Sequence, residues 1–547
     1  MTTPPLTLHN PILRGFNPDP SILRVGEDYY IATSTFEWFP GVQIHHSRDL
    51  VNWRLLPRPL TRTSQLDMLG NTDSGGIWAP CLTHDGQQFH LIYTDVKHWK
   101  PDSPFKDTHN YLVTAPTIEG PWSEPIYLNS SGFDPSLFHD DDGRKWLVNM
   151  RWDHRDNKNR FSGIVLQEYS PEQQKLIGKP QVIFYGTDLK VTEGPHIYKK
   201  DGWYYLLTAE GGTMYEHAVT LARSRDLNGP YEVHPENPFL TAYGRTELLV
   251  QKAGHGSLVD TPDGQWYLAH LGGRPLEGPE APARYCNLGR ETSLQKVEWK
   301  EGEWPYVVGG NYPQATVQVN LPAHPWPEEQ VQDDFDGETL GIHWQSLRVP
   351  VQENWASLQA RPGHLRLTGQ ESMVSVHRQS LLGRRLQAFN ATARTSVEFD
   401  PENFQQMAGL SGYYNTNNWV FLQVTFDEDL GRVLKLSQCD NGRYSEIPVC
   451  IPLSSAKVHL GLTFEHERFW FEYSLDGSDW QKIEHDFQSF KLSDEYCGGL
   501  CFTGTFIALS CHDMSGQRAV ADFDFFSYQE FPETGIQGET ALEATVS

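Results

Sequence analysis

The sequence predicts an all-β protein in which a five-bladed β-propeller is followed by a C-terminal β-sandwich. The first observation is a pattern repeated five times: a polar or aromatic lead residue opens one hydrophobic run, and an aliphatic residue closes a second run. The leads are Asp19, Trp78, Asp134, Glu193 and His255, and the closing residues are Ile31, Leu91, Leu147, Leu206 and Leu268. The resulting period of about 60 residues is typical of a propeller. The second observation is that short alternating strands follow the fifth unit, which indicates a sandwich.

Each repeated unit is predicted to be a β-hairpin. Glycine and aspartate mark the turn between its two hydrophobic runs, as at Gly26, Asp85-Gly86, Asp142-Gly143, Asp201-Gly202 and Asp263-Gly264, which is a typical hairpin signal. The lead residue then falls at the start of the first strand of its unit. Because the innermost strand of every blade lines the central channel, we expect the five lead residues to surround one pocket.

The domain boundaries follow from the end of the repeat. Residues 290–299 and 304–308 are predicted to complete the last blade, so the propeller domain is expected over residues 1–310. Residues 311–332 are rich in proline and glutamate, as is typical of a linker. Residues 333–547 are the predicted sandwich domain, with strands such as 419–426, 458–464 and 469–473.

Composition and charge restrict the class of ligand. The chain has 44 basic and 70 acidic residues, a net charge of −26, which argues against nucleic acid because phosphates are neutralised by lysine and arginine. The 17 Trp, 23 Tyr and 27 Phe residues suit a sugar, since aromatic rings serve as platforms in sugar clefts. No apolar run approaches the ~20 residues that span a bilayer, so no membrane partner is expected.

The cellular location is predicted from the first residues and from the cysteines. The start of the sequence lacks the basic and apolar regions of a signal peptide, so we expect a cytoplasmic protein. Seven cysteines without a C-x-x-C motif are typical of reduced thiols, and no zinc site is evident.

Three of the five lead residues are carboxylic acids, a composition that suits glycoside hydrolysis. That reaction needs one carboxylic acid to protonate the leaving oxygen and one carboxylate to activate water or attack carbon. A third carboxylate near the acid can raise its pKa by like-charge repulsion and hold it in place.

Several motifs make a family resemblance specific. They are Phe16-Asn-Pro-Asp19-Pro-Ser, the run 34–44 (Ser-Thr-Phe-Glu-Trp-Phe-Pro-Gly-Val-Gln-Ile), Gly76-Ile-Trp-Ala-Pro80, Gly132-Phe-Asp134-Pro-Ser, Thr192-Glu193-Gly-Pro-His196, Leu288-Gly-Arg290-Glu-Thr and, in the second domain, Phe502-Thr-Gly-Thr-Phe506. In order and spacing they closely resemble the β-xylosidases of glycoside hydrolase family 43, of the β-xylosidase/α-L-arabinofuranosidase type. The resemblance implies a five-bladed propeller and inversion of the anomeric centre.

The resemblance also implies roles for individual residues. Asp19 matches the general base, Glu193 the general acid, and Asp134 the residue that tunes and orients the acid. The expected sugar-binding residues are Phe36, Trp78, Thr213, His255, Arg290 and Phe506, the last supplied by the sandwich. Some family members hold calcium at the histidine; the sequence leaves the metal open, and no cofactor is expected to be required. A homo-oligomer acting on a small oligosaccharide is expected.

Each assignment has a structural alternative. Asp-Pro-Ser at a strand start is commonly a turn or cap; Phe36 and Trp78 could be core aromatics, His255 a hydrogen-bonded plug of the channel, and Arg290 a bridge between blades. The loop of Phe506 could be buried within the sandwich.

The leading functional hypothesis is an exo-acting β-xylosidase with α-L-arabinofuranosidase side activity. An arabinofuranosidase or arabinanase on the same fold is the second reading, because fold alone cannot separate these activities. A non-catalytic glycan-binding protein is the third. It would be expected to lack one of Asp19, Asp134 and Glu193, and all three are present.

Overall fold

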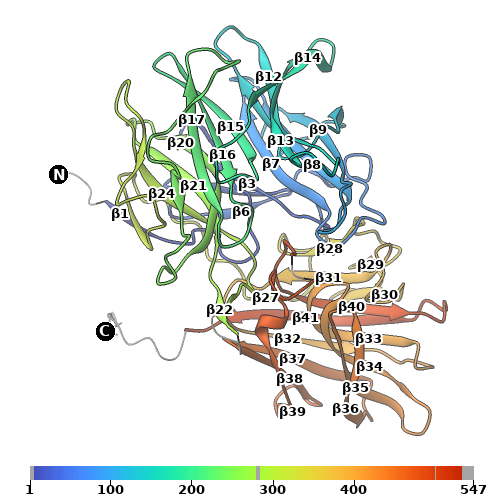
Figure 1. Cartoon of the computed structure of the whole chain (residues 1–547). Helices are drawn as coiled ribbons and strands as arrows, with labels where there is room; N and C mark the ends of the chain where they lie inside the picture. The colour runs from blue at the N-terminus through green and yellow to red at the C-terminus, as the bar shows by residue number, and fades with distance from the viewer. Residues whose placement is uncertain (1–4, 279–283, 499, 533–547) are drawn as a thin grey trace.

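A computed structural model describes residues 5–278, 284–498 and 500–532 of the 547-residue chain. Over these ranges the protein is all-β, with the N-terminal propeller, blue to green in Figure 1, lying against the C-terminal sandwich in orange and red. One 3-10 turn, η1 (Ser489–Lys491), is the helical element of the described chain. Nothing helical in these ranges has the length and apolar character needed to cross a membrane.

Five antiparallel sheets form the blades, and in each four strands are arranged in the order in which they follow along the chain, with β4 (Trp38–Phe39) omitted from the first blade and β22 (Leu276–Glu277) and β23 (Arg284–Tyr285) from the fifth. Blade I contains β2 (Ser21–Val25), β3 (Asp28–Thr33), β5 (Gln43–Ser47) and β6 (Arg54–Leu56). Blade II contains β7 (Gly76–His84), β8 (Phe89–His98), β9 (Asp107–Ala115) and β10 (Ile126–Asn129). Blade III contains β11 (Ser136–His139), β12 (Lys145–Trp152), β13 (Phe161–Ser170) and β14 (Lys175–Phe184).

The last two blades follow the same plan. Blade IV contains β15 (Glu193–Lys200), β16 (Trp203–Glu210), β17 (Ala218–Ser224), β18 (Glu232–Val233) and β19 (Leu240–Thr241). Blade V contains β20 (Gln251–Asp260), β21 (Trp266–Gly273), β24 (Glu291–Glu298) and β25 (Tyr306–Val307), with the ribbon β22 (Leu276–Glu277) and β23 (Arg284–Tyr285) between β21 and β24. The first strands β2, β7, β11, β15 and β20 contact one another in a ring, which places them around the channel. The five hairpins predicted from the turn residues are all present.

The ring closes where blade V meets blade I. The backbone N–H of Ile22 donates to Ser257 Oγ at 3.2 Å, and Arg24 pairs with Asp260 at 2.8 Å. The strand β1 (Leu6–His9) pairs with β26 (Thr316–Val319). The expected linker of residues 311–332 is therefore partly a strand, because its Thr-Val-Gln-Val segment alternates in exposure and pairs with the N-terminal segment.

Two sheets form the sandwich. The first contains β27 (Gln332–Asp333), β29 (Ala356–Ser357), β30 (Leu365–Thr368), β32 (Asn390–Glu398), β37 (Lys457–Glu465), β38 (Arg468–Ser474), β39 (Gln481–Gln488) and β41 (Val520–Glu530). The second contains β28 (Gln345–Leu347), β31 (Ser380–Arg385), β33 (Gln406–Asn415), β34 (Asn418–Asp427), β35 (Gly431–Asp440), β36 (Arg443–Pro452) and β40 (Phe506–Asp513). Residues 533–547 of the predicted sandwich domain lie outside the described ranges.

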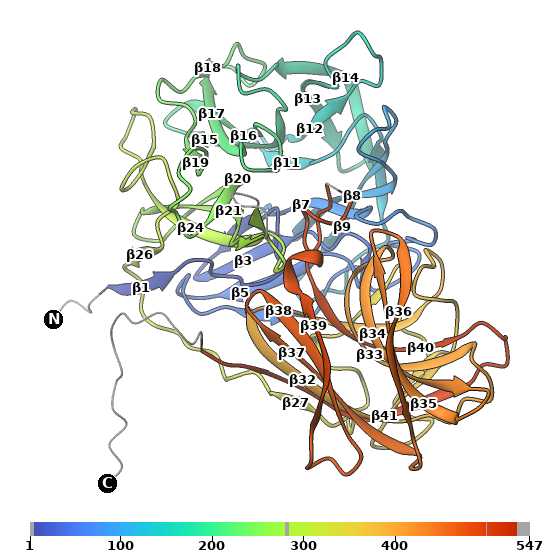
Figure 2. The same cartoon turned by 60° about the horizontal axis from the view of Figure 1, so that its bottom comes forward.

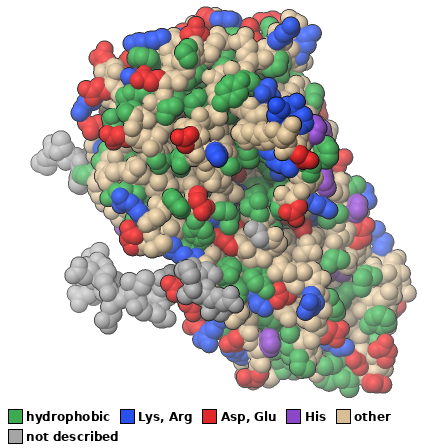
Figure 3. Space-filling view, in the orientation of Figure 1, with side chains coloured by type: hydrophobic (Ala, Val, Ile, Leu, Met, Phe, Trp, Pro, Cys, Tyr) green, Lys and Arg blue, Asp and Glu red, His purple; other side chains and the backbone are tan. Residues whose placement is uncertain are grey.

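The two domains share a sheet. The short strand β4 (Trp38–Phe39), which lies between β3 and β5 of blade I, is the edge strand of the second sandwich sheet and pairs with β28. Figure 2 shows the sandwich lying against one side of the propeller. On the face shown in Figure 3, acidic, basic and hydrophobic side chains are intermixed over both domains.

Candidate active site

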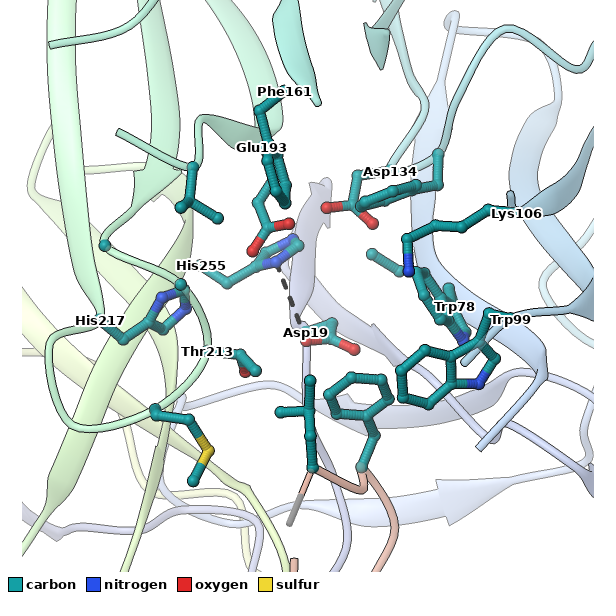
Figure 4. Close-up of a pocket in the computed structure, with 18 of the residues that line it drawn as sticks. Asp19, Trp78, Trp99, Lys106, Asp134, Phe161, Glu193, Thr213, His217 and His255 are labelled. Atoms are coloured by element: carbon teal, nitrogen blue, oxygen red, sulfur yellow. Dashed lines mark ion pairs between the residues drawn. The ribbon is translucent and has the colours of Figure 1, made fainter. Parts of the chain in front are cut away.

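A cavity of about 500 Å³ lies at one mouth of the propeller channel, and residues from all five blades and from the sandwich line it. We call it the channel pocket. Eight of the nine residues expected at the site line it: Asp19, Phe36, Trp78, Asp134, Glu193, Thr213, His255 and Arg290. Figure 4 shows how the side chains of Asp19, Asp134 and Glu193 point into the same space. The structure thus brings together residues that the sequence spreads over most of the propeller.

An unusual backbone conformation turns several lead residues into the channel pocket. Asp19, Asp134 and His255 have positive φ angles of 55°, 54° and 46°, in the left-handed region that non-glycine residues adopt rarely and Asp and His more often than most. Gly194 follows Glu193 with φ of 57°, and a Cβ atom there would lie 3.0 Å from Cε1 of His255. Glycine at this position lets the histidine ring approach the strand that carries Glu193.

Asp19 is held by three neighbours. Its Oδ2 accepts a hydrogen bond from Ser34 Oγ at 2.6 Å, and its Oδ1 accepts one from Arg290 Nη1 at 3.2 Å. The Nδ1 atom of His255 lies 3.8 Å from Oδ1, the pair joined by the dashed line in Figure 4. Burial lowers the pKa of His255, so its ring is neutral near pH 7. The carboxylate of Asp19 is thereby fixed with its face toward the pocket.

Glu193 and Asp134 behave as a coupled acidic pair. Burial and the charge of Asp19 raise the pKa of Glu193 to about 8, against the opposing charges of Arg290 and Lys106. Burial, followed by the charges of Glu193 and Asp19, also raises the pKa of Asp134 well above its usual value. Because two such groups share their protons, the pair retains a proton at neutral pH. The backbone N–H of Gly194 donates to Asp134 Oδ2 at 3.1 Å, which ties Asp134 to the strand of Glu193.

Arg290 occupies the side of the channel pocket that faces the sandwich. Besides Asp19, its Nη1 donates to Thr213 Oγ1 at 3.0 Å, and its Nη2 donates to the carbonyl oxygen of Phe502 at 3.2 Å. The guanidinium also lies 5.6 Å from the ring centroid of Phe36 and 5.3 Å from that of Phe502. Arg290 therefore connects Asp19, the Thr213 loop and the sandwich.

The sequence did not reveal a cation that faces Glu193 from blade II. Lys106 Nζ lies 5.4, 4.9 and 4.7 Å from the ring centroids of Trp78, Trp99 and Trp152, and Figure 4 shows it beside the first two rings. Burial lowers the pKa of Lys106 to about 8. Pocket residues to which the sequence analysis gave no role include Trp99, Lys106, Phe133, Trp152, Arg160, Phe161, Leu500 and Phe502.

Phe506 does not line the channel pocket, so the expected position of this residue is corrected. Its side chain is fully buried and stacks on Trp38 at a centroid distance of 3.6 Å, at the shared sheet between the domains. The aromatic ring that the sandwich contributes to the pocket is Phe502, four residues earlier, which stacks on Trp99 at 4.8 Å. Phe506 starts β40, and strand alternation directs its ring toward the domain interface.

The surroundings of His255 do not fit a calcium ion held by the protein. Calcium takes six to eight oxygen ligands, whereas among the residues that the structure describes Asp19 is the one whose carboxylate lies within 4 Å of a ring nitrogen of His255. Across the described ranges, no group of three or more His, Cys, Asp or Glu side chains is arranged to hold a metal. We therefore assign no step to a metal ion.

Comparison with known proteins identifies the family. A model described as glycosyl hydrolases family 43 matches residues 8–305, and one described as the beta xylosidase C-terminal concanavalin A-like domain matches residues 332–529. A beta-xylosidase of Bacillus subtilis (strain 168) is 54% identical over 540 residues, covering 96% of this chain and 100% of the relative. Xylosidase/arabinosidase 43B of Humicola insolens is 51% identical over 541 residues, covering 95% and 97%. The crystal structure of a xylan beta-1,4-xylosidase from Bacillus halodurans C-125 matches with a TM-score of 0.93 and 55% identity over 96% of this chain and 100% of the other. The chain belongs to glycosyl hydrolase family 43.

Proposed function

We propose that the protein is an exo-acting, inverting β-xylosidase that releases D-xylose from the non-reducing ends of β-1,4-xylo-oligosaccharides. The observation that carries this proposal is the convergence of Asp19 and Glu193 in one pocket, with the pKa of Glu193 raised to about 8. Glu193 can therefore hold a proton at neutral pH, as a general acid must. The names of the similar proteins from Bacillus and Humicola support xylose as the sugar.

In the proposed reaction, Asp19 and Glu193 act on opposite sides of the anomeric carbon. Glu193 gives its proton to the glycosidic oxygen as the bond from that oxygen to C1 breaks. Asp19 takes a proton from a water molecule whose oxygen forms the new bond to C1. Inversion requires the two carboxyl groups to stand about 6.5–9.5 Å apart, with room for that water.

Asp134 is proposed to tune and orient the acid. Its charge and that of Glu193 repel each other, which favours a proton on the pair. Its hydrogen bond from the Gly194 N–H holds it beside the strand that carries the acid. Loss of this carboxyl group should therefore change the acidity of Glu193 more than the shape of the pocket.

The other pocket residues are proposed to bind the terminal sugar. Arg290 and Thr213 offer polar groups, Phe36 and Trp78 offer ring faces, and His255 lies at the channel centre. Phe502 takes the place that was expected for Phe506. Because the sandwich covers one side of the pocket with Leu500 and Phe502, the site suits the end of a chain and hence exo action.

A side activity on α-L-arabinofuranosides is also proposed, supported by the name of the Humicola relative. The test measures hydrolysis rates on paired aryl β-D-xyloside and aryl α-L-arabinofuranoside substrates, with xylobiose as the natural substrate. Faster hydrolysis of the xyloside, and xylose as the first product from xylobiose, would support the proposal. Preference for the arabinofuranoside would favour the arabinofuranosidase, and binding without hydrolysis would favour a glycan-binding protein.

The cellular setting is proposed to be the cytoplasm, supported by seven cysteines that are all unpaired, as is usual in a reducing compartment. Fractionation of cells that express the protein would test this location. A homo-oligomer stays a prediction, which sedimentation of the purified full chain would check.

A further inference from the structure

One donor of Arg290 has no hydrogen-bond partner in the described chain. The Nη atoms of this residue are used by Asp19, Thr213 and Phe502, but Nε is fully buried and makes no hydrogen bond. A buried donor without an acceptor is costly. Oδ2 of Asp494 in the sandwich lies 4.0 Å from this Nε, beyond hydrogen-bond distance.

Asp494 likewise has one buried polar atom without a hydrogen-bond partner in the described chain. Its side chain is fully buried, and its Oδ1 accepts a hydrogen bond from the hydroxyl of Tyr414 at 2.7 Å. Its Oδ2, which faces Arg290 Nε, makes no hydrogen bond in the described chain. A buried carboxylate oxygen and a buried guanidinium N–H thus face each other across the domain interface, each without another hydrogen-bond partner.

Lys252 and Glu495 hold this carboxylate in place. Lys252 lies on β20 of the propeller, three residues before His255, with a side chain that is fully buried. Its Nζ lies 2.7 Å from Glu495 Oε1 and 3.5 Å from Asp494 Oδ2. Glu495 Oε2 accepts the backbone N–H of Cys286 at 2.8 Å. Two sandwich carboxylates are therefore clamped by the propeller next to Arg290.

We propose that Asp494 is a positioning residue for Arg290, through which the sandwich sets the orientation of the guanidinium that faces the sugar. With Asp494 opposite Nε, the guanidinium plane presents its Nη atoms to Asp19 and to the pocket. The inference rests on the proposed role of Arg290 in sugar binding. It gives the second domain a function in the site that is independent of the aromatic ring of Phe502.

The test replaces Asp494 by Asn in the full chain, which keeps the shape of the side chain and removes its charge. We expect KM for an aryl β-D-xyloside and Ki for the product D-xylose to rise together by about 10-fold or more, because the buried guanidinium loses the opposite charge beside Nε. Tyr414→Phe removes only the hydroxyl that orients Asp494, and it should shift both constants in the same direction by less. If Asp494→Asn does not fold, the Tyr414→Phe values decide, and wild-type constants there would overturn the proposal.

Asp440→Asn is the matched control. Asp440 accepts hydrogen bonds from Lys491 Nζ and Tyr496 OH, each at 2.8 Å, so it anchors the same segment without facing Arg290. This variant should keep the wild-type Ki. If it lowers the fraction of active enzyme, the apparent kcat falls, but Ki does not depend on that fraction. An equal rise in Ki for Asp440→Asn would show that general loosening of the segment is responsible, and would overturn the proposal.

A double-mutant cycle separates this inference from the proposed function. In an Arg290→Lys background, Asp494→Asn should add no further rise in Ki, because the contact with Nε is already lost. An undiminished effect in that background would overturn the positioning role. If Arg290→Lys alone left Ki unchanged, the result would contradict the proposed sugar-binding role of Arg290, on which the inference about Asp494 rests.

Discussion

Replacing Glu193 by Gln is expected to stabilise the protein above about pH 5 while it removes activity. In the folded protein burial and the charge of Asp19 raise the pKa of Glu193 to about 8, whereas in the unfolded chain the glutamate keeps its ordinary pKa of 4.5. Between these values the folded state binds more protons than the unfolded state, so the free energy of unfolding falls as the pH rises. Glutamine has no such proton and avoids this loss.

The size of the effect follows from the difference in pKa. A difference of roughly 3.5 units, at about 1.36 kcal/mol each, corresponds to ~5 kcal/mol above pH 8 and to ~3 kcal/mol at pH 7. These are upper limits, because Glu193 keeps partial contact with solvent in the pocket. The replacement also removes the repulsion that raises the pKa of Asp134, which acts in the same direction.

Thermal unfolding of both proteins between about pH 4.5 and pH 9 measures this effect. The two Tm values should coincide at the acidic end and diverge up to about pH 8, with the Gln variant higher. Glu172→Gln is a control of opposite sign, because backbone and Ser170 hydrogen bonds lower the pKa of this exposed glutamate. A Tm difference that does not change with pH, or a more stable wild type at pH 8, would refute the electrostatic reasoning.

Three further predictions concern the reaction and the domain interface. Asp134→Asn should move the alkaline limb of the pH–rate profile to lower pH, because the coupled Glu193–Asp134 pair loses one of its two mutually repelling carboxyl groups; an unmoved limb in a folded variant would argue against this role. Phe506→Ala should lower the free energy of unfolding, measured by denaturation, by ~3–5 kcal/mol because it leaves a cavity in the core. Phe502→Ala should mainly raise KM. A KM effect for Phe506→Ala and a stability effect for Phe502→Ala would contradict the placement of the two rings. Proton NMR should show α-xylose as the first product from an aryl β-xyloside, and early β-xylose would exclude inversion.

The sequence predicted those parts of the site that belong to the repeat. Asp19, Asp134, Glu193 and His255 occupy equivalent positions in different blades. Their common position in the repeat was therefore enough to predict that they meet at one channel. Lys106 and Trp99 come from the connection between β8 and β9, where no residue recurs in the other blades. Periodicity carries no information about such loops, and the aromatic residues Trp99 and Phe105, which lie among lysines, were the one signal available.

The errors at the domain boundary have a related cause. Phe502 and Phe506 lie four residues apart in one segment, and the choice between them depends on where β40 begins. The composition of residues 311–332 predicted a linker and gave no sign of β26, because pairing with β1 is a contact between distant segments. Contacts of this kind are fixed by tertiary packing, which overrides local propensity.

The sheet that the two domains share through β4 and β28 cannot be completed until late in synthesis. Trp38 leaves the ribosome roughly 300 residues before its partner Leu347, an interval of about 15–60 s at ordinary elongation rates. During that time the β4 edge, two residues beyond the pocket ring Phe36, has no neighbour to hydrogen-bond and is open to pairing with other chains. Cells that make many copies of this protein at once would therefore benefit from a chaperone that covers the nascent blade I, and slower translation of the region before β28 would be expected to increase aggregation.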